Sequence, residues 1–195
     1  PIFLETSRKN IAKLMNFKPH EVFFTSGGTE GNNWIIKGTA FKKREFGKHI
    51  ITSSVEHPSV INTMSQLEQL GFDVTYLPVD KTGHVRVEDL KNAIRPDTIL
   101  VSIMAVNNEV GSIQPITEIG RVLDDYPSIS FHVDGTQAIG KGLDDRFIDP
   151  RVDYFTFSGH KFHAPRGIGF IYMKSGKQLE PLMAGGGQEK GQRSG

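Results

Sequence analysis

The sequence predicts an α/β fold in which a mostly parallel sheet of seven strands carries helices on both faces. Short apolar runs rich in β-branched and aromatic residues alternate with amphipathic, helix-like segments along the chain. Most of these runs are continuously apolar, as in strands that are covered on both sides. Strand–helix alternation of this kind favours parallel pairing and a three-layer arrangement.

The expected elements follow from these runs in order. We expect strands at 22–25, 50–53, 74–77, 99–105, 129–133, 154–157 and 168–173, and helices at 30–46, 59–70, 87–93 and 116–125. In the second helical segment the apolar residues Val60, Ile61, Met64 and Leu67 recur at three- and four-residue steps. That spacing places them on one buried stripe of a helix.

Composition narrows the classes of function. The chain has 195 residues, with 23 Lys and Arg against 22 Asp and Glu, so its formal net charge is +1. Such a balance gives no electrostatic reason to expect a nucleic acid or a membrane as partner. Cysteine is absent, which fits a reducing compartment, and we expect a cytoplasmic protein. Neither a signal peptide nor a membrane-spanning run is visible.

The chain starts without Met and stops on a glycine-rich stretch, so we expect a fragment whose single domain covers residues 1–195. In parallel sheets, ligands bind beyond the carboxyl ends of the strands. The residues that follow each expected strand are therefore the candidates for a functional site.

The first such loop, Ser26–Glu30, can receive an anion. Gly27 and Gly28 let the backbone approach a ligand closely, and the helix that follows offers unpaired N–H groups. Thr29 adds a hydroxyl donor. A plain capping turn with Thr29 as N-cap remains the alternative.

The loops after the second and fourth expected strands carry His57 and Asn108. His57 either caps or packs the helix that Pro58 opens, or it stacks on a planar ligand and moves a proton. Asn107 and Asn108 either shape a turn or present an amide to a substrate or cofactor.

Asp134 directly follows the fifth expected strand. A carboxylate at the end of an apolar strand is sheltered and needs a cationic partner. The protonated ring nitrogen of pyridoxal phosphate is one such partner, and a helix cap or an internal ion pair is the other explanation.

Lys161 follows the sixth expected strand on a loop with Ser158, His160 and His163. A desolvated lysine among such neighbours suits Schiff-base formation better than a surface role. Ser158 and His160 could donate to a phosphate. An anion loop, a ring-stacking histidine, a buried aspartate and an activated lysine at the strand ends together indicate a pyridoxal 5'-phosphate site, and we expect no metal.

Six short motifs carry a family resemblance. They are TSGGTE at 25–30, EHPSV at 56–60, VNNEVG at 106–111, HVD at 132–134, SGHKFH at 158–163 and GGGQE at 185–189. With these motifs in this order, nearly the whole chain closely resembles the cysteine desulfurases of the class V aminotransferase group. The resemblance implies the large domain of fold type I, truncated at both ends and without the small C-terminal domain.

The resemblance also implies a role for each candidate residue. Lys161 would form the Schiff base, Asp134 would pair with the ring nitrogen, and His57 would stack on the ring. Gln137 would bind the phenolic oxygen and Asn108 would orient the substrate, L-cysteine. Gly28, Thr29, Ser158 and His160 would hold the phosphate, while Lys161 and His57 would move protons as the ring acts as electron sink.

The chain departs from the family pattern at Gly159 and Ala164, where the family has Ala and Gly; both exchanges are between small residues. The family's sulfur-accepting cysteine and carboxylate-binding arginine belong to the small domain. A phosphate-binding threonine comes from the partner subunit, which implies a homodimer. This chain contains no cysteine, so no persulfide can form on it. The resemblance also implies a sulfur-acceptor protein, as in iron–sulfur cluster assembly.

Two other functions stay open at this point. One is another enzyme of the same fold, such as an aminotransferase or a selenocysteine lyase, although the Asn-Asn-Glu and Gly-Gly-Gly-Gln-Glu runs favour a desulfurase. The other is a non-catalytic scaffold with a vestigial site.

Overall fold

In the computed structural model, seven strands form one sheet that is covered by helices on both faces. The structure describes residues 2–107, 109–137, 148–159, 168–177 and 179. The strands of the sheet are β1 (Val22–Thr25), β2 (His49–Ser53), β3 (Asp73–Leu77), β4 (Thr98–Met104), β7 (Ser130–Asp134), β8 (Tyr154–Ser158) and β9 (Gly169–Met173). Each overlaps one of the expected strands, so the predicted sheet is confirmed.

The strand order is β1-β9-β8-β7-β4-β2-β3. The five strands from β8 to β3 pair in parallel, whereas β9 is antiparallel to both of its neighbours. Because β9 is reversed between β8 and β1, β1 points the same way as the parallel strands. The carboxyl ends of β1, β2, β4, β7 and β8 therefore share one edge of the sheet.

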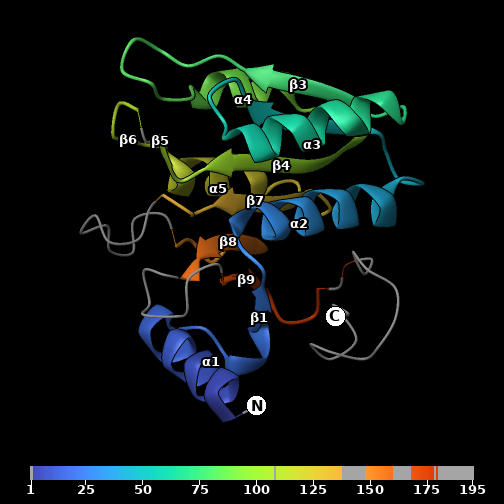
Figure 1. Ribbon diagram of the computed structural model, residues 1–195. Coiled ribbons are helices and arrows are strands. Elements are labelled where there is room, and N and C mark those ends of the chain that lie inside the picture. Colours follow the sequence, from blue (N-terminus) through green and yellow to red (C-terminus); the bar gives the residue numbers. More distant parts are fainter. Residues whose placement is uncertain (1, 108, 138–147, 160–167, 178, 180–195) are drawn as a thin grey trace.

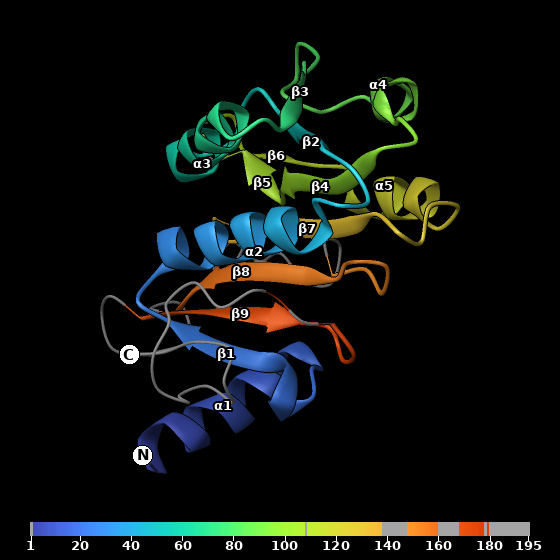
Figure 2. The same cartoon turned by 90° about the vertical axis from the view of Figure 1, so that its right-hand side faces the viewer.

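The helices form the two outer layers (Figures 1 and 2). They are α1 (Ile2–Met15), α2 (Gly28–Lys43), α3 (Pro58–Gln69), α4 (Val87–Ala93) and α5 (Ile116–Leu123), with a short 3-10 helix, η1, at Pro19–Glu21. Apolar residues of α2 and α3 pack together on one face of the sheet. Residues of α1, α4 and α5 share a core on the other face. The predicted three-layer arrangement is confirmed.

Besides the short η1, a helix and a hairpin were not expected from the sequence. Helix α1 buries little more than Arg8, Ile11 and Ala12, so its apolar stripe is too narrow to give a clear helical period. The other is a two-stranded hairpin of β5 (Val106–Asn107) and β6 (Ser112–Ile113). Strands of two residues are too short for an alternating pattern to be recognised.

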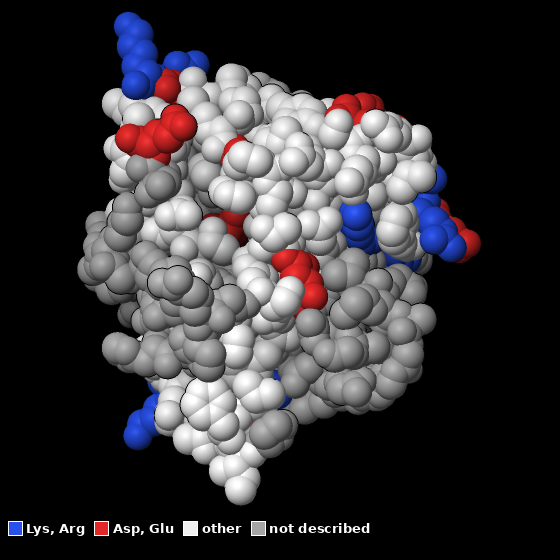
Figure 3. Space-filling view, in the orientation of Figure 1, with Lys and Arg blue, Asp and Glu red and all other residues white. Residues whose placement is uncertain are grey.

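Charged side chains of both signs are scattered over the face shown in Figure 3, without a broad patch of one sign among the coloured residues. Among the residues that the structure describes, no helix combines the length and the apolar character needed to cross a membrane.

His132 on β7 is a polar side chain in the middle of the sheet. Its two ring nitrogens bond the hydroxyls of Ser102 on β4 and Thr156 on β8, at 2.8 and 2.9 Å. The residue is fully buried, and this desolvation lowers the pKa of its imidazole to about 3. The neutral ring thus ties together three adjacent strands whose ends build the site described below.

We expect this buried imidazole to make the fold less stable in acid. Between pH 6.5 and 3 the imidazole of His132 is protonated in the unfolded chain but neutral in the folded one. The free energy of unfolding therefore falls as the pH falls, by up to about 1.4 kcal/mol per pH unit. His132→Gln should lower stability at pH 7 by about 1–3 kcal/mol, because two buried hydroxyls lose their partner. In the same variant the free energy of unfolding should depend less steeply on pH below 6.5, which is the acid slope of this protein. Urea unfolding at pH 7.0 to 4.5 measures both effects.

The matched control is His20→Gln, which changes an exposed histidine and should keep the full acid slope. If the free energy of unfolding depended on pH equally in His132→Gln and in the parent chain, this would contradict the conclusion that folded His132 stays neutral.

Candidate active site

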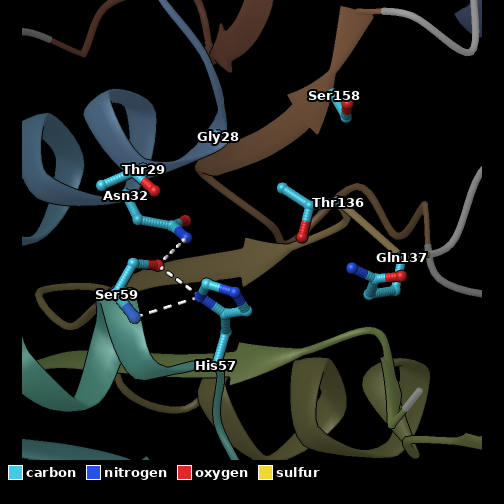
Figure 4. Close-up of a pocket in the computed structure, with 8 residues that line it drawn as sticks. All are labelled: Gly28, Thr29, Asn32, His57, Ser59, Thr136, Gln137 and Ser158. Carbon is cyan, nitrogen blue, oxygen red and sulfur yellow. Dashed lines mark hydrogen bonds between the residues drawn. The ribbon is translucent and has the colours of Figure 1, made fainter.

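A cavity of about 270 Å³ opens at the shared carboxyl edge of the strands. This volume is near the lower end of the range of small-molecule sites. Its lining comes from loops far apart in the sequence (Figure 4): Gly28, Thr29, Asn32, His57, Ser59, Thr136, Gln137 and Ser158. The structure thus brings together five residues that the sequence singled out, namely Gly28, Thr29, His57, Gln137 and Ser158.

Three other predicted site residues, Asn108, His160 and Lys161, lie outside the described residues. The cavity also has three lining residues that the sequence reasoning missed: Asn32, Ser59 and Thr136. Asn32 lies on the buried side of α2, but nothing in the local sequence pattern indicates that it reaches the cavity.

The glycine loop after β1 is held tightly against the sheet. Gly27 has φ 149°, a conformation that side chains other than glycine rarely adopt. A Cβ on Gly28 would lie 2.7 Å from Thr136 Cγ2, and one on Gly169 would lie 2.8 Å from the Gly27 carbonyl carbon. The start of α2 is therefore fixed at the cavity wall, where the N–H groups of its first turn can bind an anion.

Glu30 stabilises this loop from within the first turn of α2. Its carboxylate accepts the backbone N–H and the hydroxyl of Ser26, at 3.1 and 3.2 Å. The N-cap residue of α2 is Gly27, so no side chain at this position caps the helix. The capping-turn alternative with Thr29 as N-cap is thus wrong, because the helix begins at Gly28.

Asp134 ends β7 just below the cavity and is only 4% exposed. One carboxylate oxygen accepts the backbone N–H of Thr136 at 3.0 Å, and the other accepts Nδ2 of Asn32 at 3.1 Å. No ion pair to Asp134 is found within the described part of the chain. A carboxylate oxygen has more than one acceptor position, so this buried side chain can still accept a further hydrogen bond.

His57 is the N-cap residue of α3, and its side chain is exposed at the cavity. Its Nδ1 accepts the backbone N–H of Ser59 at 3.0 Å and lies 2.9 Å from the Ser59 hydroxyl oxygen. The sequence left capping and ring contact as alternatives, but the geometry allows both. One nitrogen caps the helix while the ring itself borders the cavity (Figure 4).

Glu56, next to His57, is buried and links two strand ends. Its Oε2 accepts the Ser53 hydroxyl at the end of β2 and the Met104 backbone N–H at the end of β4, at 2.5 and 3.0 Å. Burial raises the pKa of its carboxyl to about 8, and the Asp134 charge adds to the increase. Because Oε2 accepts two donors, the proton of the neutral acid belongs on Oε1, which has no partner within the described residues.

The model of the family described as aminotransferase class-V matches residues 2–193. The chain belongs to this family. A NifS/IcsS protein homolog of Lactobacillus delbrueckii subsp. bulgaricus is 64% identical over 192 residues, which cover 98% of this chain and 50% of that protein. Cysteine desulfurase IscS of Clostridium botulinum is 48% identical over 188 residues, covering 96% of this chain and 47% of that protein.

A solved structure described as SspA in complex with cysteine has the same fold as this chain. It superposes with a TM-score of 0.89 at 43% identity, covering 98% of this chain and 55% of that one. The chain spans about half the length of the curated relatives that it matches.

Glu56→Gln should change how stability depends on pH. Folded Glu56 keeps its proton up to about pH 8, whereas the unfolded carboxyl loses it near 4.5, so its contribution to the free energy of unfolding is lost as the pH rises through this window. Glutamine cannot ionise and keeps an oxygen for Ser53 and Met104. Urea unfolding should show the variant gaining at least about 1 kcal/mol on the parent chain between pH 5 and 8.

The control is Glu88→Gln at an exposed carboxyl on α4, for which the difference from the parent should stay constant. An equally constant difference for Glu56→Gln would mean that Glu56 is ionised in the fold.

Proposed function

We propose that this chain is the cofactor-binding domain of a pyridoxal phosphate-dependent cysteine desulfurase. The observation that carries the proposal is a glycine loop at a helix start on one wall of the cavity, together with a buried carboxylate, Asp134, that bonds two other lining residues, Asn32 and Thr136, and has no cationic partner in the described structure. A small ligand with a phosphate at one end and a protonated ring nitrogen at the other has complementary groups. The cysteine desulfurase relative and the cysteine-bound neighbour support the choice of reaction.

The residues present fit this cofactor. The cavity narrows where a Cβ on Gly28 would reach Thr136, so only glycine leaves the helix start open to a phosphate. The region around Asn32 and Asp134 is rich in hydrogen-bond acceptors. Oδ1 of Asn32 is buried without a partner in the described region, and it belongs to the same amide that bonds Asp134. A cationic N–H is the donor that forms the strongest hydrogen bonds with such acceptors.

Each residue then has a role in the proposal. Gly28, Thr29, Ser158 and His160 hold the phosphate, Asp134 holds the ring nitrogen, and Gln137 holds the phenolic oxygen. His57 covers the ring face and handles protons together with Lys161, which attaches the cofactor covalently. Asn108 orients the substrate. Pyridoxal phosphate supplies an electron sink when it is bound.

In the proposed reaction, the C–S bond of L-cysteine breaks and its β-carbon gains a proton, which gives L-alanine. The sulfur goes to an acceptor thiol, which becomes a persulfide, so no external oxidant or reductant is needed. Because the chain has no cysteine, that thiol belongs to another part of a longer protein or to an acceptor protein in iron–sulfur cluster assembly. We also propose a homodimer, in which the partner subunit adds to the phosphate site, and a cytoplasmic location.

The cofactor assignment is tested with the full-length gene product. Adding pyridoxal phosphate should give a visible absorption band, and Lys161→Ala should abolish it because the amine that attaches the cofactor is lost. Lys81→Ala, at an exposed lysine, controls for nonspecific reaction of the aldehyde with surface amines and should keep the band. A band that persists in Lys161→Ala would overturn the assignment.

The reaction is tested separately, by measuring L-alanine and sulfide from L-cysteine in the presence of a thiol reductant. We expect both products in equal amounts from the parent protein, and a loss of at least about 100-fold in Lys161→Ala. A protein that binds the cofactor but forms no alanine would be another enzyme of the family.

A further inference from the structure

Asn32 is a polar side chain in a place that packing alone does not explain. It lies on the face of α2 that is buried against the sheet and is 1% exposed. Its neighbour Gly31 allows this close approach, because a Cβ there would meet methyl groups of Thr156 and Ile171 at 2.9 Å. A buried carboxamide is costly unless its hydrogens are bonded.

Both hydrogens of the Asn32 amide have acceptors. Nδ2 lies 3.1 Å from Oδ2 of Asp134 and 3.2 Å from the hydroxyl oxygen of Ser59. The orientation of the amide is fixed by chemistry, since an ionised carboxylate only accepts hydrogen bonds and would repel Oδ1. Asn32 therefore donates to Asp134 and to Ser59 at the same time.

These donors set the direction of the next bond. Because the Ser59 hydroxyl oxygen accepts from Asn32, its own hydrogen is available for Nδ1 of His57, 2.9 Å away (Figure 4). The backbone N–H of Ser59 points at the same Nδ1, at 3.0 Å. With two donors at Nδ1, the proton of the neutral ring belongs on Nε2.

We propose that Asn32 and Ser59 are positioning residues, which tie His57 to Asp134 through one directed chain of hydrogen bonds. The chain runs from Asp134 at the end of β7, through Asn32 on α2 and Ser59 on α3, to the ring of His57. It fixes the spacing of two groups that, on the proposed function, contact the cofactor at its ring nitrogen and its ring face. It also keeps the Nε2 proton of His57 ready for donation.

Simple helix packing does not account for this chain of bonds. The neighbouring Asn33 already links α2 and α3, since its Oδ1 accepts the Thr63 hydroxyl at 3.1 Å while its Nδ2 donates to the Thr29 carbonyl at 3.0 Å. Asn33 makes as many hydrogen bonds as Asn32 but does not line the cavity. It is therefore the matched control for a purely structural role.

The test reads His57 directly and needs no cofactor. Imidazole nitrogen shifts are measured by ¹⁵N NMR on the full-length protein, with His57→Gln identifying the signals. We expect Nε2 to carry the proton and Nδ1 to accept. Asp134→Asn should shift both His57 signals, because it changes the acceptor at the far end of the chain of bonds.

The second step of the NMR test removes a residue from the middle of the hydrogen-bond chain between Asp134 and His57. With Asn32→Ala in place, the effect of Asp134→Asn on His57 should fall to less than about half, whereas Asn33→Ala should leave it intact. Ser59→Ala, at a half-buried position, makes the same test if Asn32→Ala does not fold. An undiminished effect in the Asn32 and Ser59 variants, or a proton on Nδ1 in the parent, would overturn the proposal.

Cofactor affinity gives a further readout. Asn32→Ala should weaken pyridoxal phosphate binding by about tenfold, as expected for a lost hydrogen bond to a charged group, and Asn33→Ala should weaken it less than about twofold. A parent protein that binds no cofactor would refute the proposed function, while the NMR comparison would still decide whether the bridge exists. Normal affinity in Asn32→Ala would refute its positioning role.

Discussion

The reversed strand β9 is the constraint on which the site depends. Strand β1 lies at the end of the sheet and reaches the parallel strands only through β9, which is antiparallel to both β1 and β8. Two successive reversals return β1 to the common direction. Its glycine loop therefore opens at the same edge as Asp134 and Ser158, and a β9 parallel to β8 would have sent that loop to the opposite edge.

A second principle is that polar groups buried near this edge join elements rather than act alone. His132 spans three strands, Glu56 connects the ends of β2 and β4, and Asn32 connects β7 with α3. Hydrogen bonds to these partners offset the free-energy cost of burying each polar group. Because the partners come from different elements, these bonds also fix the relative positions of the loops around the cavity, which packing of apolar side chains specifies less sharply.

The sequence was informative where a pattern repeats or where a loop follows a strand. Continuous apolar runs predicted all seven strands of the sheet, and Gly28, His57 and Ser158 were found because each lies at a strand end. Helix α1 was missed because few of its residues are buried. Asn32 was missed for another reason: its importance depends on Asp134 and Ser59, and no local pattern reveals contacts between residues so far apart in the chain.

The neutral state of Glu56 determines the charge of the site. If Glu56 were ionised, it would place a second carboxylate charge close enough to Asp134 for the two to repel each other. With its pKa raised to about 8, Glu56 keeps its proton at neutral pH and adds no negative charge beside Asp134. Burial of one carboxyl group thus limits how much negative charge collects at this end of the sheet.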